Sequence, residues 1–193
     1  MAKLRKETKA DISAVLADDV AKRTYRGQTI FSTIKRPGKS KSVKRKASND
    51  RFADGNRWAK GILKDPEIKK LYSKGINDNL PNAHTVAVQD YLTPPTIHYI
   101  SQKQHTGAIG DKIRIKATDS FQVTSVDVTI TDKNGTELEK GPAERYKRKP
   151  QMWIYTVTVA NPDVAGTVIK VTAMDRPKNK VTKEEKIADN VER

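Results

Sequence analysis

Residues 123–135 read VTSVDVTITDKNG and carry two signals of an antiparallel sheet. Apolar and polar side chains alternate from Val126 to Thr131, the period of a strand with one buried and one solvated face. The DKNG segment that follows (132–135) has the composition of a hairpin turn, because Asn and Gly tolerate the backbone conformations that tight turns require. This stretch therefore predicts a half-buried strand that ends in a turn.

Similar β-branched, alternating segments recur at intervals of about ten residues from Thr96 onward, the spacing of an all-β sandwich. They read IHYIS, DKIRIKATD, VTSVDVTITD, the stretch from Glu137 to Lys147, MWIYTVTV, TVIKVTAMD and KVTKEEKI. Trp153 is predicted to lie in the core, on one strand face with Tyr155, Val157 and Val159. The predicted immunoglobulin-like β-sandwich covers residues 96–188, and residues 189–193 form a tail.

The half that precedes Pro94-Pro95 has a different pattern, a β-hairpin followed by about three short helices. Two short strands flank Arg26-Gly27, and helical spacing then begins near Val43. Asp65-Pro66 and Asn82 mark the starts of two further helices. Residues 1–20 are interpreted as a flexible arm and 21–93 as a basic α+β domain. The predicted apolar stripe of the first helix includes Val43 and Phe52, with Trp58 close to it, which favours core packing over base stacking.

Positive charge is concentrated in this half. The chain has 38 Lys+Arg against 23 Asp+Glu, a formal net charge of +15. Residues 22–64 hold 14 basic and 2 acidic residues, so 12 of the 15 excess charges lie there. A run of cations with so few acids, and with aromatic residues among them, is typical of a protein that contacts a polyanion, most often nucleic acid.

The candidate nucleic-acid-binding residues are the cations of this run, which can neutralise phosphates and release counterions. They are Lys22, Arg23, Arg26, Lys35, Arg36, Lys39, Lys41, Lys44, Arg45, Lys46 and Arg51. A second possible patch lies between two strands of the sandwich, at Arg145, Lys147, Arg148 and Lys149. An exposed loop without a ligand is the alternative interpretation of that second patch.

No motif for catalysis, a cofactor or a metal stands out, so the chain is predicted to be neither an enzyme nor a cofactor-binding protein. His84, His98 and His105 are scattered and lack ligand spacing, and no nucleophile elbow or phosphate-binding loop is present. The carboxylate pairs Glu137/Glu139 and Glu184/Glu185 are interpreted as solvated strand positions. Asp119 and Asp175 each close a strand, which leaves open a Ca²⁺ site at one end of the sandwich.

The composition also bounds the location of the chain. It contains no cysteine, which excludes disulfides and thiol chemistry and fits a reducing compartment. No apolar run has the length of a membrane span, and the first 30 residues lack the apolar core of a secretory signal. A cytoplasmic protein is expected, with a virion or another assembly as an alternative.

Several motifs occur in an order that resembles an uncharacterised family of small basic bacterial proteins. They are the Tyr25-Arg26-Gly27 hairpin, Arg51-Phe52 with Trp58-Ala59-Lys60, Asp65-Pro66-Glu67, Asp90-Tyr91-Leu92 before Pro94-Pro95-Thr96-Ile97, and Val171-Thr172-Ala173-Met174-Asp175. The C-terminal half of this family resembles bacterial immunoglobulin-like domains. The resemblance implies the architecture and no particular activity.

Two functions follow from these observations. The first is a non-catalytic protein that binds nucleic acid, DNA or RNA, with little sequence specificity. The alternative is a structural subunit of a larger assembly, such as a phage-like particle, a filament or a surface scaffold, that uses the sandwich for contacts with protein partners or with itself.

Overall fold

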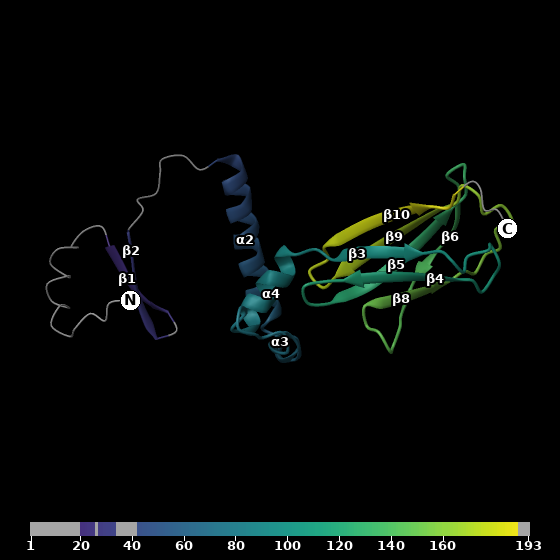
Figure 1. Cartoon of the computed structure of the whole chain (residues 1–193). Helices are drawn as coiled ribbons and strands as arrows, with labels where there is room; N and C mark the ends of the chain where they lie inside the picture. The colour runs from purple at the N-terminus through teal and green to yellow at the C-terminus, as the bar shows by residue number, and fades with distance from the viewer. Residues whose placement is uncertain (1–19, 26, 34–41, 189–193) are drawn as a thin grey trace, which may run out of the picture. The chain divides into compact units, whose positions relative to one another are not determined.

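The computed structural model describes residues 20–25, 27–33 and 42–188. These residues form a two-stranded hairpin, three helices and eight further strands (Figure 1). The chain divides between Lys46 and Ala47 into two compact units, each of which is described by itself. None of the helices in the described ranges has the length and hydropathy that a membrane-spanning segment needs.

The predicted N-terminal hairpin is confirmed. β1 (Val20–Tyr25) pairs with β2 (Gln28–Thr33) in antiparallel register, with Tyr25 opposite Gln28. This register leaves a two-residue turn, and Gly27 adopts φ 75°, which a residue without Cβ reaches at little cost. Residues 1–19 of the predicted arm and the tail at 189–193 lie outside the described residues.

The three predicted helices are present as α2 (Val43–Ile62), α3 (Pro66–Ser73) and α4 (Ala83–Leu92). The start of α3 is capped as its sequence predicts, because the Asp65 carboxylate accepts hydrogen bonds from the backbone N–H groups of Glu67 and Ile68. The start of α4 carries a reciprocal capping box between Asn82 and Thr85.

The helices share a small aromatic core centred on Tyr72, which is fully buried. The Trp58 ring meets Tyr72 edge-on at 6.2 Å, and Phe121 of the sandwich stacks on Tyr72 at 4.5 Å between ring centroids. The packing role predicted for Trp58 is thus confirmed. Phe121 also joins this helical core to the sandwich, within the unit formed by residues 47–193.

The prediction that Val43 and Phe52 are buried was wrong. Val43 is 86% exposed and Phe52 is 55% exposed. The two residues are exposed because α2 is longer than α3 and α4. With a rise of 1.5 Å per residue, the 20-residue α2 is about 30 Å long, whereas α3 and α4 with 8 and 10 residues are about half that length or less. The buried residues of α2, Gly55 and Ala59, therefore belong to its second half.

The C-terminal part is a sandwich of two four-stranded antiparallel sheets (Figure 1). One sheet has the strand order β3-β4-β8-β7 and the other β10-β9-β5-β6. The strands are β3 (Thr96–Ser101), β4 (Lys112–Thr118), β5 (Val123–Thr131), β6 (Glu137–Pro142), β7 (Glu144–Arg145), β8 (Met152–Thr156), β9 (Val168–Asp175) and β10 (Lys180–Lys186).

Alternate residues of these strands form the sandwich core, as the period of the sequence predicts. Trp153 is 5% exposed and Tyr155 is 4% exposed, so their predicted burial is confirmed. Val159, predicted on the same face, is 42% exposed because β8 ends at Thr156 and the alternation no longer applies beyond it. The turn at 132–135 forms as predicted, with the Asp132 N–H donating to Thr136 O.

Candidate functional site

The predicted nucleic-acid-binding residues fall into four groups in the structure. Lys44, Arg45 and Lys46 are exposed in the first turn of α2. Lys22 and Arg23 belong to β1, but their side chains lie outside the described part. Five further predicted cations lie outside the described residues, at Arg26, Lys35, Arg36, Lys39 and Lys41, and Arg51 makes up the fourth group.

Arg51 has a structural contact. Its guanidinium Nη2 donates a 3.1 Å hydrogen bond to Leu92 O, at the last residue of α4. Carbonyl groups at the end of a helix have no intrahelical donor, so Arg51 satisfies one of them and ties α2 to α4. Arg57, further along α2, forms an ion pair with Asp54. These two cations of α2 are therefore engaged within the fold.

The N-terminus of α2 is strongly electropositive. Its first turn contains no acidic residue, and Lys44, Arg45 and Lys46 follow directly after the first residue. The unpaired N–H groups at a helix start already carry a partial positive charge. Ser42 Oγ accepts one of them, the N–H of Arg45, at 3.3 Å. Side-chain cations and backbone dipoles thus add their fields at the same place.

The second predicted patch is divided. Arg145 is half-buried, donates a hydrogen bond to Val123 O and lies 4.7 Å from the centroid of the Trp153 ring. Lys147, Arg148 and Lys149 are exposed in the turn between β7 and β8. Arg145 therefore packs against the sandwich, whereas the other three cations face solvent.

A third group of cations was missed by the sequence reasoning. Lys112, Arg114 and Lys116 alternate along β4 with the buried Ile113 and Ile115, so they share the outer face of their sheet. None of these three cations forms an ion pair within the described ranges. The period-2 alternation of β4 was the signal that could have found them.

Aromatic and apolar groups border this outer face of β4. Tyr99 of β3 is paired with Lys116 and is 43% exposed, while Ile154 of β8 is paired with Arg114. The opposite sheet differs, because its Lys170 is neutralised by Glu184 at 3.1 Å. Within the part of the chain that the structure describes, Lys112, Arg114 and Lys116 thus form no ion pair on one face of the sandwich, whereas the other face carries a cross-strand ion pair.

Asp90, Asp119 and Asp175 meet where α4 joins the sandwich. One carboxylate oxygen from each lies within 4.8 Å of the other two. Asp90 and Asp175 are 0% and 1% exposed, and Asp119 is half-buried. The sequence predicted that Asp119 and Asp175 lie at the same end of the sandwich. Asp90 was not included in that prediction, because the helix that carries it precedes the predicted domain boundary at Pro94-Pro95.

The electrostatics of this acidic cluster are unusual. Burial raises the pKa of the Asp90 carboxyl to about 7, and the charges of Asp119 and Asp175 act in the same direction, whereas the hydrogen bond from Tyr72 lowers it. Burial also raises the pKa of Asp175, against the hydrogen bonds from Asn179. Each of these buried groups thus resists ionisation in the absence of a positive partner.

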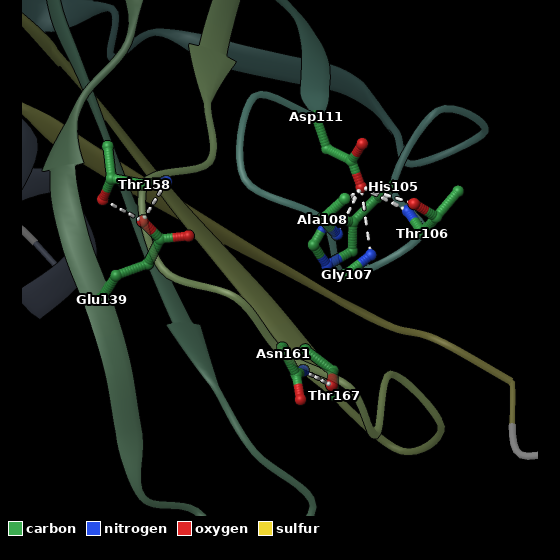
Figure 2. Close-up of polar contacts among 9 residues, drawn as sticks. All are labelled: His105, Thr106, Gly107, Ala108, Asp111, Glu139, Thr158, Asn161 and Thr167. Carbon is green, nitrogen blue, oxygen red and sulfur yellow. Dashed lines mark hydrogen bonds and ion pairs between the residues drawn. The ribbon is translucent and has the colours of Figure 1, made fainter.

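A second polar cluster surrounds the loop that precedes β4 (Figure 2). Asp111 Oδ2 accepts the backbone N–H groups of Thr106, Gly107 and Ala108, and these bonds lower the pKa of Asp111 although desolvation opposes them. His105 is 9% exposed, and neither of its ring nitrogens has a hydrogen-bond partner among the described residues. Its Nδ1 lies 3.7 Å from Asp111 Oδ2. Asp111 therefore organises the loop around a buried imidazole.

Glu139 corrects another expectation from the sequence. It was interpreted as solvated but is 8% exposed, and its Oε2 accepts from the Thr158 N–H at 2.8 Å and the Thr158 hydroxyl at 2.6 Å (Figure 2). The Tyr155 hydroxyl donates to the same oxygen at 3.1 Å. Burial raises the pKa of Tyr155 to about 12, and the bond to Glu139 adds to this effect. A carboxylate with three donors is a satisfied structural group.

Comparison with known proteins identifies no family for this chain. No protein-family model and no curated protein matches the sequence. Among solved structures, CopC from Methylosinus trichosporium OB3b aligns at 12% identity with a TM-score of 0.35, over 48% of this chain and 89% of CopC. An engineered protein aligns at 17% identity and the same TM-score, over 49% of this chain and 20% of its own length. Neither likeness carries a functional argument.

Proposed function

We propose that this chain is a non-catalytic protein that binds nucleic acid through its phosphates, with little sequence specificity. The observation that carries the proposal is the start of α2, where Lys44, Arg45 and Lys46 are exposed and no acid is present in the first turn. Backbone N–H groups and Lys or Arg side chains at a helix N-terminus together form a site for an anion.

The position of these cations argues against a purely solubilising role. Cations at a helix N-terminus interact unfavourably with the helix dipole, and a helix optimised for stability carries Asp or Glu there. Three consecutive cations at this end of α2 therefore cost stability until a negative ligand neutralises them. A phosphate backbone supplies such a ligand along its whole length.

Phe52 is a second residue of α2 that we propose contacts nucleic acid. It is 55% exposed on α2. An exposed aromatic ring can stack on a base of a single strand, without preference for its identity. We assign Phe52 this role in place of core packing.

The outer face of β4 extends the proposal to the sandwich. Lys112, Arg114 and Lys116 lie about 7 Å apart along the strand, so they form a row of cations on one face of the sheet. The exposed turn with Lys147, Arg148 and Lys149 follows in the same sheet. We assign both groups to additional backbone contacts.

The proposal is tested by titrating the full chain with a DNA duplex, a single-stranded DNA and a structured RNA at two salt concentrations. The expected result is binding to each of them that weakens steeply as salt rises, because counterion release dominates phosphate contacts. Absence of binding, or an affinity that does not change with salt, would refute it. Nuclease treatment of nucleic acid that copurifies with the chain provides an independent check.

The alternative function is a structural subunit of a larger assembly, and two exposed apolar residues favour it. Ile109 is 67% exposed and Val159 is 42% exposed. Their loops are joined by a hydrogen bond from Gly110 N–H to Val157 O. Such a subunit would self-associate as its concentration rises, and sizing measurements over a range of concentrations would detect this. An Ile109→Asp variant would then remain monomeric.

We also propose that the sandwich is immunoglobulin-like. If β3, β4, β5, β7, β8, β9 and β10 are named A to G with β6 as an inserted C′ strand, the sheets read A-B-E-D and G-F-C-C′. This is the strand order of the immunoglobulin fold. An experimental structure of residues 96–188 in the full chain tests the assignment.

A further inference from the structure

The three carboxylates at the junction of α4 and the sandwich form a site that the nucleic-acid proposal does not use. We propose that Asp90, Asp119 and Asp175 bind one Ca²⁺ ion. They come from three separate elements: α4, the loop after β4 and the end of β9. An ion bound by all three would hold the helical core on this end of the sandwich.

The spacing of the carboxylate oxygens suits Ca²⁺. One oxygen from each residue lies within 4.8 Å of the others. Three oxygens that each lie 2.3–2.6 Å from one Ca²⁺ ion and are evenly spaced around it are at most about 4.0–4.5 Å apart. The three carboxylate oxygens therefore lie about as close together as the ligands of a single Ca²⁺ ion. Ca²⁺ takes six to eight oxygen ligands in flexible geometry, so water or further oxygens would complete its shell beside the three carboxylates.

Two carboxylate oxygens of the cluster lack a hydrogen-bond donor among the described residues. Asp90 is fully buried, and its Oδ1 accepts no hydrogen bond from any described residue; the same holds for Asp119 Oδ1. The carboxyl groups of Asp90 and Asp119 can hydrogen-bond to each other only when one of the two carries a proton. An unpartnered buried carboxylate oxygen is costly, and coordination to a cation removes that cost.

Hydrogen bonds to the other carboxylate oxygens of the cluster, including both oxygens of Asp175, orient the three side chains. Tyr72 Oη donates to Asp90 Oδ2, and the N–H groups of Phe121 and Gln122 donate to Asp119 Oδ2. The Asn179 N–H donates to Asp175 Oδ1 at 2.6 Å, and its Nδ2 donates to Asp175 Oδ2 at 2.7 Å. Such outer hydrogen bonds are the usual means by which proteins fix the ligands of a metal ion.

The charge balance also calls for a cation. Three ionised carboxylates carry a charge of −3 in a largely buried volume. Arg176 is the neighbouring cation in sequence, yet it forms no ion pair with any of the three within the described part of the chain. Like charges at this distance require either a proton or a positive ion. Ca²⁺ neutralises two charges and leaves all three carboxylates ionised.

The test uses the full chain and Tb³⁺, a luminescent ion that occupies Ca²⁺ sites and is excited by nearby aromatic rings. Tyr72 contacts Asp90 directly, so bound Tb³⁺ is expected to show saturable emission on tyrosine excitation. Ca²⁺ should displace Tb³⁺ and abolish the emission, whereas Mg²⁺ at the same concentration should not. With Ca²⁺ at about 100 times its Kd, the melting temperature should rise by about 5–10 °C above its value in chelator.

Asp119→Asn is the variant of choice, with Asp127→Asn as the matched control. Asp127 lies on β5, outside the acidic cluster. Asp119→Asn should lose both the emission and the Ca²⁺-dependent melting shift, while in chelator it should melt at or above the wild-type temperature because one like charge is gone. Asp127→Asn should retain both signals. Equal emission from Asp119→Asn and wild type, or no Ca²⁺ shift in the wild type, would overturn the proposal in favour of a shared proton.

Discussion

The Tyr72 hydroxyl donates a 2.5 Å hydrogen bond to Asp90 Oδ2, and both side chains are fully buried. This bond joins α3 to α4 inside the helical core. Tyr72 also stacks on Phe121, so a single residue connects the two helices to the sandwich. The relationship shows that the helices of the second unit are held by a polar contact as well as by apolar packing.

Tyr72→Phe should lower the free energy of unfolding by about 1–3 kcal/mol, because it removes the donor and leaves a buried carboxylate oxygen without a partner. Chemical denaturation followed by circular dichroism measures the change. Tyr99→Phe is the control, since the Tyr99 hydroxyl donates a weak 3.4 Å hydrogen bond to Met152 Sδ and the residue is 43% exposed. Equal losses in the two variants would contradict the role given to the Tyr72 bond.

Charge reversal of Lys44, Arg45 and Lys46 to Glu should weaken duplex binding and reduce the slope of log affinity against log salt by about 3. The matched control reverses three exposed cations of and after α3, namely Lys69, Lys70 and Lys74, and so changes net charge equally. Affinity measured at several salt concentrations separates a local effect from one of overall charge. Equal losses in the two triple variants would rule out a specific site at the start of α2.

Phe52→Ala should reduce affinity for single-stranded nucleic acid about tenfold, as expected from the loss of one stacked base. Its free energy of unfolding should change by less than about 0.5 kcal/mol, because the side chain is 55% exposed. Fluorescence anisotropy and thermal melting give the two quantities. A large loss of stability with unchanged affinity would return Phe52 to a packing role.

His105 should make stability depend on pH below neutrality. Burial lowers the pKa of His105 from 6.5, although the Asp111 and Glu139 carboxylates act in the other direction. As pH falls below about 6.5, the unfolded chain binds a proton that the folded chain does not, so this contribution to stability decreases. It is fully present above pH 6.5.

The His105 contribution is isolated by comparing wild type with His105→Leu, because Asp90 titrates in both proteins. The difference between their free energies of unfolding should change between pH 7 and pH 5, with the wild type losing more stability on acidification. A His98→Gln variant, altered at an exposed position, is the matched control for the removal of a histidine elsewhere in the chain. A constant difference between wild type and His105→Leu would show that His105 does not titrate differently on folding.

Gly107→Ala should destabilise the fold far more than Gly110→Ala. Both glycines have positive φ, 91° and 93°. A Cβ at Gly107 would lie 2.0 Å from Asn161 O, whereas a Cβ at Gly110 meets nothing within 4 Å. The expected losses are about 3 kcal/mol or more for Gly107 and about 1 kcal/mol for Gly110, measured by denaturation. Similar losses would mean that the loop at Gly107 can shift.

Local patterns predicted the elements well, because each depends on residues that are neighbours in sequence. The burial of Trp153 followed from alternation along one strand, and the start of α3 followed from the Asp65 cap. Glu139 was misplaced because a register irregularity between Ile130 and Thr131 changes the pairing of β6, which alternation alone does not reveal. Phe52 was misplaced because helical periodicity does not say how far a neighbouring helix extends.

The acidic cluster depended on tertiary structure. Asp119 and Asp175 could be linked because each closes a strand at one end of the sandwich. Asp90 lies on a helix before that sandwich, and only the packing of Tyr72 and Phe121 brings it to the same place. The cations of the N-terminal run were visible in the composition, but which of them remain exposed depended on contacts such as that of Arg51 with Leu92.

The contact of Asn179 with α4 bears on the order in which this chain folds during synthesis. Asn179 Nδ2 donates to Tyr91 O at 3.1 Å and to Asp90 O at 3.5 Å, across 88 and 89 positions in sequence. The helical segment leaves the ribosome long before the β9–β10 turn has been translated. The hydrogen bonds from Asn179 to the end of α4 therefore form only after Asn179 has left the ribosome. In a nascent chain that stalls before this residue, the carbonyl groups of Asp90 and Tyr91 lack this donor.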